Sequence, residues 1–411
     1  MRPQDSVIDA SFMRRALALA GRGHGNTSPN PLVGAVLVKD GKIIGQGWHR
    51  HAGEPHAEIE ALRDAELKGN SPKGAILYVT LEPCCTHGRT PPCTDAIKAA
   101  GIKRVVVAAT DPNPKHAGKG FKILVRAGIE VISFSGRARR SARAASKSSG
   151  QRRARSDVPY QKLADEAVRL NHAFNHWIVH RTPFVTVKAA MTLDGKIATA
   201  SGESKWITGE KARAEGMRLR ARADAILVGV NTVLADDPGL TIRQGPRSKV
   251  QGPRLRRIVL DSRARTPLKS KVVRDEFAAL TTIVVGQSAP ARRVAALAKT
   301  VSVVRAPLRG GRIDLRWLLK KLGREKVTSL LVEGGGEVNA SFLLGGLAHR
   351  VAFFYAPKIL GGRDELGNPG ELHNFVELLI NLCLLHPQYD PTEIDVVPAR
   401  QLWVETGPDL Q

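Results

Sequence analysis

The chain has 411 residues, of which 42% are hydrophobic and 25% charged, and its formal net charge at pH 7 is +25. This length and composition suit a globular protein of two domains, and no apolar run is long enough to predict a membrane-spanning helix. Residues 1–20 lack a signal-peptide pattern, and four cysteines do not predict a disulfide framework, so we expect a protein of the reducing cytoplasm with no membrane partner.

Residues 1–135 show the pattern of one α/β domain. Hydrophobic periodicity predicts elements in the order helix, two strands, helix, strand, helix, strand, helix and strand, where Asp40-Gly41 marks a hairpin turn. Their ranges are 8–22, 32–39, 42–47, 56–68, 75–80, a helix closing at Gly101, 103–109, 120–127 and 130–134. This alternation predicts three layers, with helices on both faces of a sheet.

The next segment, residues 136–158, is a basic linker. Between residues 136 and 156 it carries eight Arg and Lys residues and no acid, and most of its other residues are Ala, Ser and Gly. A segment that cannot bury apolar area is predicted to be disordered. The alternative is a nucleic-acid-binding arm, and a phosphorylated substrate would also suit so basic a chain.

Regular structure is predicted again from residue 159. A connecting helix is expected over 159–180 and a second α/β domain over 181–362. Its strands are predicted at 184–192, 225–230, 257–261, 281–286, 301–305, 329–333 and 350–356, with a turn at Asp194-Gly195 and a helix over 209–222. In the tail, residues 363–411, the stretch 374–386 is apolar and 387–411 shows no clear period. Either the tail folds differently or a coding shift has changed it.

The strongest chemical signal is His56-Ala57-Glu58 followed by Pro83-Cys84 and, nine residues later, Cys93. One His and two Cys give a tetrahedral zinc ion three protein ligands and leave one position for water, whose pKa the metal lowers toward about 7. Glu58, two residues beyond His56, can stay off the metal and carry a proton from the water to a leaving amine. Zinc deaminases carry an H-x-E and P-C-x-x-C signature with the Glu outside the ligand set. Here eight residues, not two, separate Cys84 from Cys93.

Each of these residues also has an ordinary structural interpretation. Taken alone, Glu58 could be a solvated acid in the first turn of a helix. Taken alone, Cys84 and Cys93 could be small buried residues of the core. Their combination predicts the zinc site. Cys85 is expected to be a bystander and Cys383 a core residue, whereas His49, His51 and His87 could contact substrate or be loop histidines.

Three segments carry a family resemblance: residues 28–36 (SPNPLVGAV), 53–58 (GEPHAE) and 80–93 (TLEPCCTHGRTPPC). They resemble the bifunctional riboflavin-biosynthesis deaminase–reductases, and the likeness covers residues 8–134 and 163–362. It implies an N-terminal cytidine-deaminase-like three-layer α/β/α domain and a C-terminal dihydrofolate-reductase-like α/β domain. The first would deaminate a small phosphorylated pyrimidine with zinc, and the second would reduce its ribosyl group to ribityl with NADPH. By resemblance alone, we also expect a homo-oligomer.

The resemblance also implies site residues. His56, Cys84 and Cys93 would bind zinc, and Glu58 would shuttle protons. In the second half, the substrate would meet Ser204, Arg220, Leu240, Arg243 and Glu333. The cofactor would meet Ala190, Trp206, Thr232, Asp236, Ser262, Gly335, Gly336, Glu337, Val338, Asn339, Ala340 and Ser341.

Elementary chemistry adds some support for this second site. The glycines after Glu333 open a predicted helix whose backbone N–H groups can hold a phosphate, although such turns also occur for steric reasons. Arg220 and Arg243 could bind a substrate phosphate or be solvated charges. Trp206 could stack on a ring or fill the core.

Three other functions remain open from the sequence. The chain could be a nucleic-acid deaminase that grips RNA with its basic segment, which leaves the second domain unexplained. It could be a deaminase with an inactive reductase domain, because the tail departs from the family pattern. It could also be a scaffold, which has no need of a water-activating carboxylate. Nucleic acid is not the expected partner.

Overall fold

The structure is a computed structural model that describes residues 3–87, 91–134, 139–140, 158–192, 210–242, 255–356, 395–397 and 401–405. The chain divides into two compact units, Met1–Arg181 and Thr182–Gln411. Most of the basic segment, the turn at Asp194-Gly195 and Cys383 lie outside the described residues.

The first unit is built on one six-stranded sheet of order β2-β1-β3-β4-β5-β6. β3, β4 and β5 run parallel, and β1 is antiparallel to both β2 and β3. The strands are β1 Gly34–Lys39, β2 Lys42–Trp48, β3 Ile76–Leu81, β4 Arg104–Ala109, β5 Glu130–Ser133 and β6 Arg139–Arg140. The helices are α1 Pro3–Ala20, α2 Ala57–Leu67, α3 Cys93–Ala99, α4 Lys119–Arg126, α5 Val158–Leu170 and α6 His172–His180, with the 3-10 turn η1 at Gly21–Gly23.

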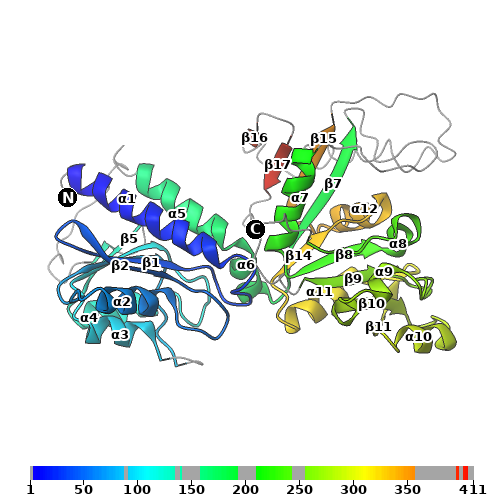
Figure 1. Ribbon diagram of the computed structural model, residues 1–411, viewed down its shortest axis with the longest axis horizontal. Helices are drawn as coiled ribbons and strands as arrows, with labels where there is room; N and C mark the ends of the chain where they lie inside the picture. The colour runs from blue at the N-terminus through cyan, green and yellow to red at the C-terminus, as the bar shows by residue number, and fades with distance from the viewer. Residues whose placement is uncertain are drawn as a thin grey trace. The chain divides into compact units, whose positions relative to one another are not determined.

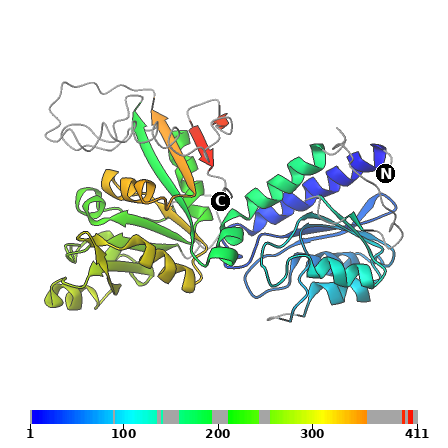
Figure 2. The same ribbon diagram turned by 180° about the vertical axis from the view of Figure 1, so that it is seen from behind.

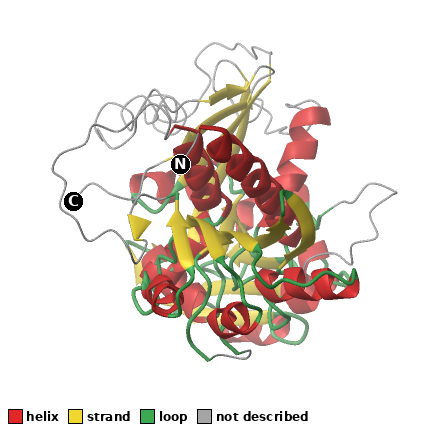
Figure 3. Ribbon diagram, turned by 90° about the vertical axis from the view of Figure 1, so that its left-hand side faces the viewer, coloured by secondary structure: helices red, strands yellow, loops and turns green. Residues whose placement is uncertain are grey.

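Helices cover both faces of this sheet, as predicted. Alternate side chains of a strand point to opposite faces. Ala35 and Leu37 therefore pack with α2, α3 and α4, while Val36 and Val38 pack with α1 and α5. Figures 1 and 3 show the sheet between its two helical layers. The predicted three-layer α/β/α architecture is confirmed.

Two glycines on β2 let α2 lie directly on the sheet. A Cβ at Gly47 would stand 2.5 Å from Glu60 Cβ, and a Cβ at Gly45 would stand 2.3 Å from Ala61 O. Such distances are shorter than any van der Waals contact allows, so only glycine fits. This close approach fixes the first turn of α2, which carries His56 and Glu58.

The connecting helix predicted over 159–180 is two helices, α5 and α6, separated at Asn171. The side chain of Asn171 is buried, where it accepts from Leu32 N at 2.7 Å and donates to Leu32 O at 2.9 Å. Because the side chain of Asn171 bonds to the backbone of Leu32, the helix is interrupted at this residue. A second departure is β6, a two-residue strand antiparallel to β5 inside the segment predicted as a disordered linker.

The second unit holds a nine-stranded sheet of order β11-β10-β9-β8-β14-β7-β15-β17-β16. Its strands are β7 Phe184–Thr192, β8 Ala225–Gly229, β9 Arg256–Leu260, β10 Thr281–Gly286, β11 Ser302–Ala306, β14 Ser329–Val332, β15 Arg350–Ala356, β16 Asp395–Val397 and β17 Gln401–Glu405. A separate hairpin pairs β12 Leu308–Arg309 with β13 Arg312–Ile313. The helices are α7 Glu210–Arg222, α8 Val230–Asp236, α9 Lys271–Arg274, α10 Ala291–Leu297, α11 Leu315–Arg324 and α12 Gly336–Leu344, with a 3-10 turn η3 at Ala278–Leu280.

Seven neighbouring strands of this sheet, from β11 across to β15, run parallel. On one face Leu227 and Ile258 pack with α11 and α12, and on the other Val228 and Val259 pack with α8, α9 and α10. Figure 2 shows these strands from behind. A parallel sheet covered on both faces places ligands at the carboxyl ends of its strands.

The tail contributes two strands to the second sheet, although its sequence does not resemble the final strands of the family. β17 pairs antiparallel with β15, and β16 pairs with β17, so both extend the second sheet. The pairing of Ala352 with Trp403 is part of this register. These strands are five and three residues long, too short for a hydrophobic period to be recognised. None of the helices in the described part of the chain is long and apolar enough to cross a membrane.

Replacing Asn171 with Ala should destabilise the first unit by about 1–3 kcal/mol, because it leaves a buried N–H and C=O of Leu32 unpaired. Urea denaturation followed by circular dichroism measures the loss, and hydrogen exchange at the Leu32 amide should accelerate. Asn175→Ala is the matched control, since that half-buried side chain donates one hydrogen bond, to Val168 O, and its Oδ1 has no partner in the described part of the chain. Equal loss in both variants would contradict the role assigned to Asn171.

Candidate active sites

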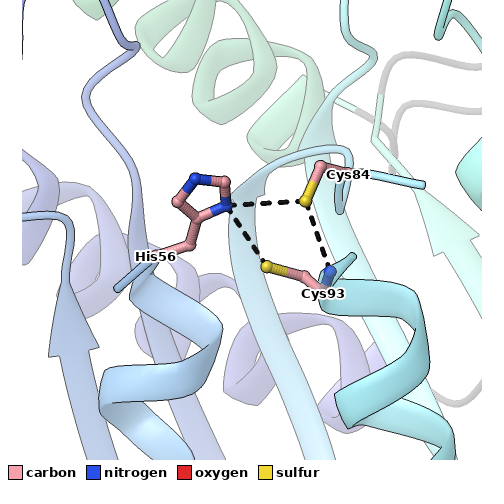
Figure 4. A group of neighbouring side chains, drawn as sticks. All are labelled: His56, Cys84 and Cys93. Atoms are coloured by element: carbon pink, nitrogen blue, oxygen red, sulfur yellow. Dashed lines mark hydrogen bonds between the residues drawn. The ribbon is translucent and has the colours of Figure 1, made fainter. Parts of the chain in front are cut away.

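Three chain segments bring the predicted metal ligands together. His56 stands at the N-terminus of α2, Cys84 follows β3, and Cys93 is the first residue of α3. His56 Nδ1 lies 3.5 Å from Cys84 Sγ and 3.3 Å from Cys93 Sγ, and the three donor atoms all lie within 4.8 Å of one another. Figure 4 shows the imidazole nitrogen facing both sulfurs.

These donors fit a zinc ion. With zinc bond lengths of about 2.0–2.3 Å, neighbouring donors in a tetrahedral site lie about 3.3–3.8 Å apart. Nitrogen with two thiolates is also a ligand set that zinc prefers. The backbone N–H of Cys93 donates to Cys84 Sγ at 3.3 Å, which orients that sulfur and favours its thiolate. The side chain of Cys93 and this backbone N–H both lower the pKa of Cys84, with the side chain having the larger effect.

Glu58 lies beside these ligands in the first turn of α2. It is 3% exposed, and its Oε2 has no hydrogen-bond partner among the described residues. Burial raises the pKa of Glu58 to about 7, and the nearby Cys84 adds to this shift. A buried carboxylate oxygen without a protein partner is placed to hold water or a reacting group, and a pKa near neutrality suits a group that both takes and gives a proton.

Residues around the ligands hold them in position. His49 is buried, with Nδ1 3.0 Å from Pro55 O and Nε2 3.1 Å from Asn30 Nδ2. Because a carbonyl only accepts, Nδ1 donates and Nε2 accepts, so His49 is neutral and fixes the residue before His56. His51, by contrast, forms an exposed ion pair with Glu54, and His87 is exposed.

Glu82 is a site residue that the sequence did not single out. It is buried, and its carboxylate accepts from the N–H groups of Asp111, Gly118 and Gly120. It therefore ties the end of β3 to the loop that covers it. The sequence could have indicated this role, because Glu82 lies between Thr80 and Cys84 in the segment that carries the metal ligand. Cys85 points away from the ligand group and lies 3.9 Å from His116 Nδ1.

The second unit contains a cavity of about 440 Å³ at the carboxyl ends of β8, β9 and the loop after β14. Seven of the residues expected to meet the cofactor line it: Thr232, Ser262, Gly335, Gly336, Glu337, Val338 and Ser341. A Cβ at Gly335 would meet nothing closer than Thr232 Oγ1, at 3.9 Å. The backbone at the N-terminus of α12 is thus open to a phosphate, so these residues fit a nucleotide.

Other expected residues of this unit lie elsewhere. The cavity is not lined by Ala190, Asp236, Asn339 or Ala340. Asn339 is buried, and Asp236 is exposed at the end of α8. Ser204, Trp206 and Arg243 lie outside the described residues.

Two of the expected substrate residues, Arg220 and Glu333, bind each other. Arg220 donates from Nε and Nη2 to the two carboxylate oxygens of Glu333, each at 2.8 Å, and from Nη1 to Thr241 O at 2.9 Å. Burial alone would raise the pKa of Glu333, but the hydrogen bonds and charge of Arg220 lower it below its usual value. Leu240 is buried beside this network. Three of the five N–H groups of the Arg220 guanidinium thus donate to protein.

The geometry defines a zinc-dependent hydrolytic deaminase joined to a nucleotide-binding α/β unit. Residues 6–109 match the family model described as the cytidine and deoxycytidylate deaminase zinc-binding region, and residues 183–390 match the RibD C-terminal domain. The second match extends past residue 362, where the resemblance in the sequence ended.

Similar proteins agree with both matches. The riboflavin biosynthesis protein RibD of Aquifex aeolicus is 43% identical over 88% of this chain and 91% of its own, and that of Escherichia coli is 39% identical over 86% and 89%. The structure of Acinetobacter baumannii RibD is 33% identical, with a TM-score of 0.74, and covers 98% of this chain and 100% of its own.

A Thermotoga maritima structure, described as a diaminohydroxyphosphoribosylaminopyrimidine deaminase/5-amino-6-(5-phosphoribosylamino)uracil reductase, is 32% identical with a TM-score of 0.72. It covers 98% of this chain and 100% of its own. The chain belongs to the RibD family. It is a bifunctional deaminase and reductase of riboflavin biosynthesis that uses zinc and NADPH.

Replacing Cys84 with Ser should lower zinc affinity at least about tenfold, because even partners of metal ligands contribute 10–100-fold. Metal analysis by mass spectrometry after dialysis against a chelator measures the effect. The control is Cys85→Ser, which changes a neighbouring thiol that faces His116 and should keep its zinc. Loss of zinc in Cys85→Ser, or its retention in Cys84→Ser, would overturn this ligand set.

Proposed function

We propose that the first unit deaminates 2,5-diamino-6-hydroxy-4-(5-phosphoribosylamino)pyrimidine and that the second reduces the ribosyl group of the product to ribityl. The observation that carries the deaminase half is the buried Glu58 oxygen without a partner beside three metal-binding donor atoms. The name of the Thermotoga maritima relative supports this substrate, and so does the net positive charge, which favours a phosphorylated molecule.

His56, Cys84 and Cys93 hold zinc in this proposal, and the bound zinc supplies an acidified water molecule. Glu58 would take a proton through its buried Oε2 while the oxygen of the water bonds to the carbon that bears the amino group. The same carboxylate then delivers the proton to the leaving nitrogen, so ammonia departs and an oxygen replaces it.

In the reductase half, the residues that line the cavity hold NADPH, which supplies the hydride. Gly335 and Gly336 present backbone N–H groups to a cofactor phosphate, and Thr232 and Ser262 offer hydroxyl groups. Glu333 faces the substrate as a carboxylate whose orientation Arg220 fixes through two hydrogen bonds. Arg220 keeps two further N–H groups that could reach the substrate, and Arg243 is the other arginine predicted to bind it.

An active reductase is favoured over an inert one because the second sheet continues through two tail strands and the cavity keeps seven expected cofactor residues. No observation favours a nucleic-acid substrate or a scaffold. The homo-oligomer and the cytoplasmic location remain predictions from the sequence.

Mass spectrometry of the pyrimidine product tests the whole reaction. Incubation with the diaminopyrimidine alone should give the mass change of one amino group replaced by oxygen, and added NADPH should add two hydrogens. Ammonia release and NADPH oxidation provide independent measures. Reduction without prior deamination would reverse the order, and no reduction of the deaminated compound would leave an inert second unit.

A further inference from the structure

Four arginines line the cavity of the second unit, and all of them are exposed. Arg265 follows β9, Arg309 and Arg312 lie on the β12–β13 hairpin, and Arg316 lies in the first turn of α11. The acidic residues that line the same cavity are Glu337 and Asp314, and Asp314 accepts from Trp317 N as the N-cap of α11. This cavity therefore carries excess positive charge.

Two of these arginines are held by protein groups. Arg265 Nη2 donates to Asn231 Oδ1 at 2.7 Å, and Arg316 Nη2 donates to Gly345 O at 2.8 Å. Arg309 and Arg312 have no hydrogen-bond or ion-pair partner within the described ranges. Two guanidinium groups are thus available to a ligand.

The hairpin brings these two free guanidinium groups together. Arg309 and Arg312 are paired directly across β12 and β13, and the turn between them consists of Gly310 and Gly311, both with positive φ. Side chains directly opposite in a hairpin are neighbours, and like charges there repel. A bound dianion would remove the repulsion between the two guanidinium groups. The planar N–H donors of both groups match the oxygens of a phosphate.

The order of strands puts this pair away from the reacting end of the site. Glu333 and Arg220 lie at the end of β14, whereas the hairpin lies over the end of β10, where Leu308 is the neighbour that a Cβ on Gly286 would meet at 3.1 Å. Three strand steps, β14 to β8 to β9 to β10, separate the two places, about 14 Å at the usual spacing. A dinucleotide whose nicotinamide meets the substrate near Glu333 and whose pyrophosphate lies at α12 extends its adenosine toward the hairpin.

We propose that Arg309 and Arg312 bind the 2′-phosphate on the adenosine ribose of NADPH and so make the reductase prefer NADPH to NADH. This inference rests on the proposed use of the cavity as the cofactor site. It adds the residues that distinguish the two cofactors, which differ only in that phosphate.

The test compares dissociation constants for NADPH and NADH, obtained by fluorescence titration of the full-length protein. Changing both residues, Arg309→Gln with Arg312→Gln, should weaken NADPH about 100-fold, since each charged hydrogen bond contributes about a tenfold factor. NADH binding should change less than about twofold. The control is Arg292→Gln on α10, which removes an exposed charge outside the cavity and should alter neither constant. Equal weakening of both cofactors, or of neither, would overturn the assignment.

A second variant separates this inference from the proposed function. Gly335→Val fills the cavity at the N-terminus of α12 and should weaken NADPH and NADH together, because both carry the pyrophosphate. If Gly335→Val affects neither cofactor, the cavity is not the cofactor site, and both the reductase site proposed above and the arginine assignment fail. If Gly335→Val weakens the binding of NADPH and NADH while the double arginine variant binds NADPH normally, only the arginine assignment fails.

Discussion

Two thiols, an imidazole and a carboxylate lie against one another at the buried junction of β3, α2 and α3. Without a cation, the negative charges of such a cluster repel in a medium that screens them poorly. The hydrogen bond between the two thiols lowers the pKa of Cys84 and raises the pKa of Cys93, as expected where two thiols compete for one proton. A divalent cation removes the conflict by taking both sulfurs as thiolates. The glycines of β2, the Asn30–His49–Pro55 chain and Glu82 matter because they hold the segments that meet there.

Both units use the same property of parallel sheets. The zinc ligand Cys84 follows the end of β3, and the nucleotide cavity lies beyond β8 and β9, where the loops from neighbouring strands converge. Strand ends are rigid, whereas the loops after them can vary, so catalytic groups are placed accurately without constraining the rest of the fold. In the second unit the Arg220–Glu333 pair has the corresponding role, because it fixes a carboxylate that would otherwise rotate freely.

Many of the strands and the metal site could be predicted from the sequence, because the patterns that indicate them are local. Alternation and turn residues predicted β1, β2, β7, β10 and β15 closely, and the spacing of His56, Cys84 and Cys93 indicated the metal site. The missed features depend on tertiary context. The break at Asn171 follows from hydrogen bonds to Leu32, 139 residues away. The two-residue strands of the hairpin are too short for any period, and the pairing of Arg220 with Glu333 joins residues 113 apart. Such long-range pairings leave no mark in a single sequence.

The central claim is that Glu58 carries the proton at a zinc site whose ligands it does not join. The most direct measurement is ammonia release by Glu58→Gln protein whose zinc content has been verified. The account predicts full zinc occupancy with a rate about 10²–10⁴-fold lower, while reduction of the deaminated compound by NADPH continues unchanged. Deamination at the normal rate with zinc bound would contradict it, and so would loss of the metal together with activity, which would make Glu58 part of the ligand set.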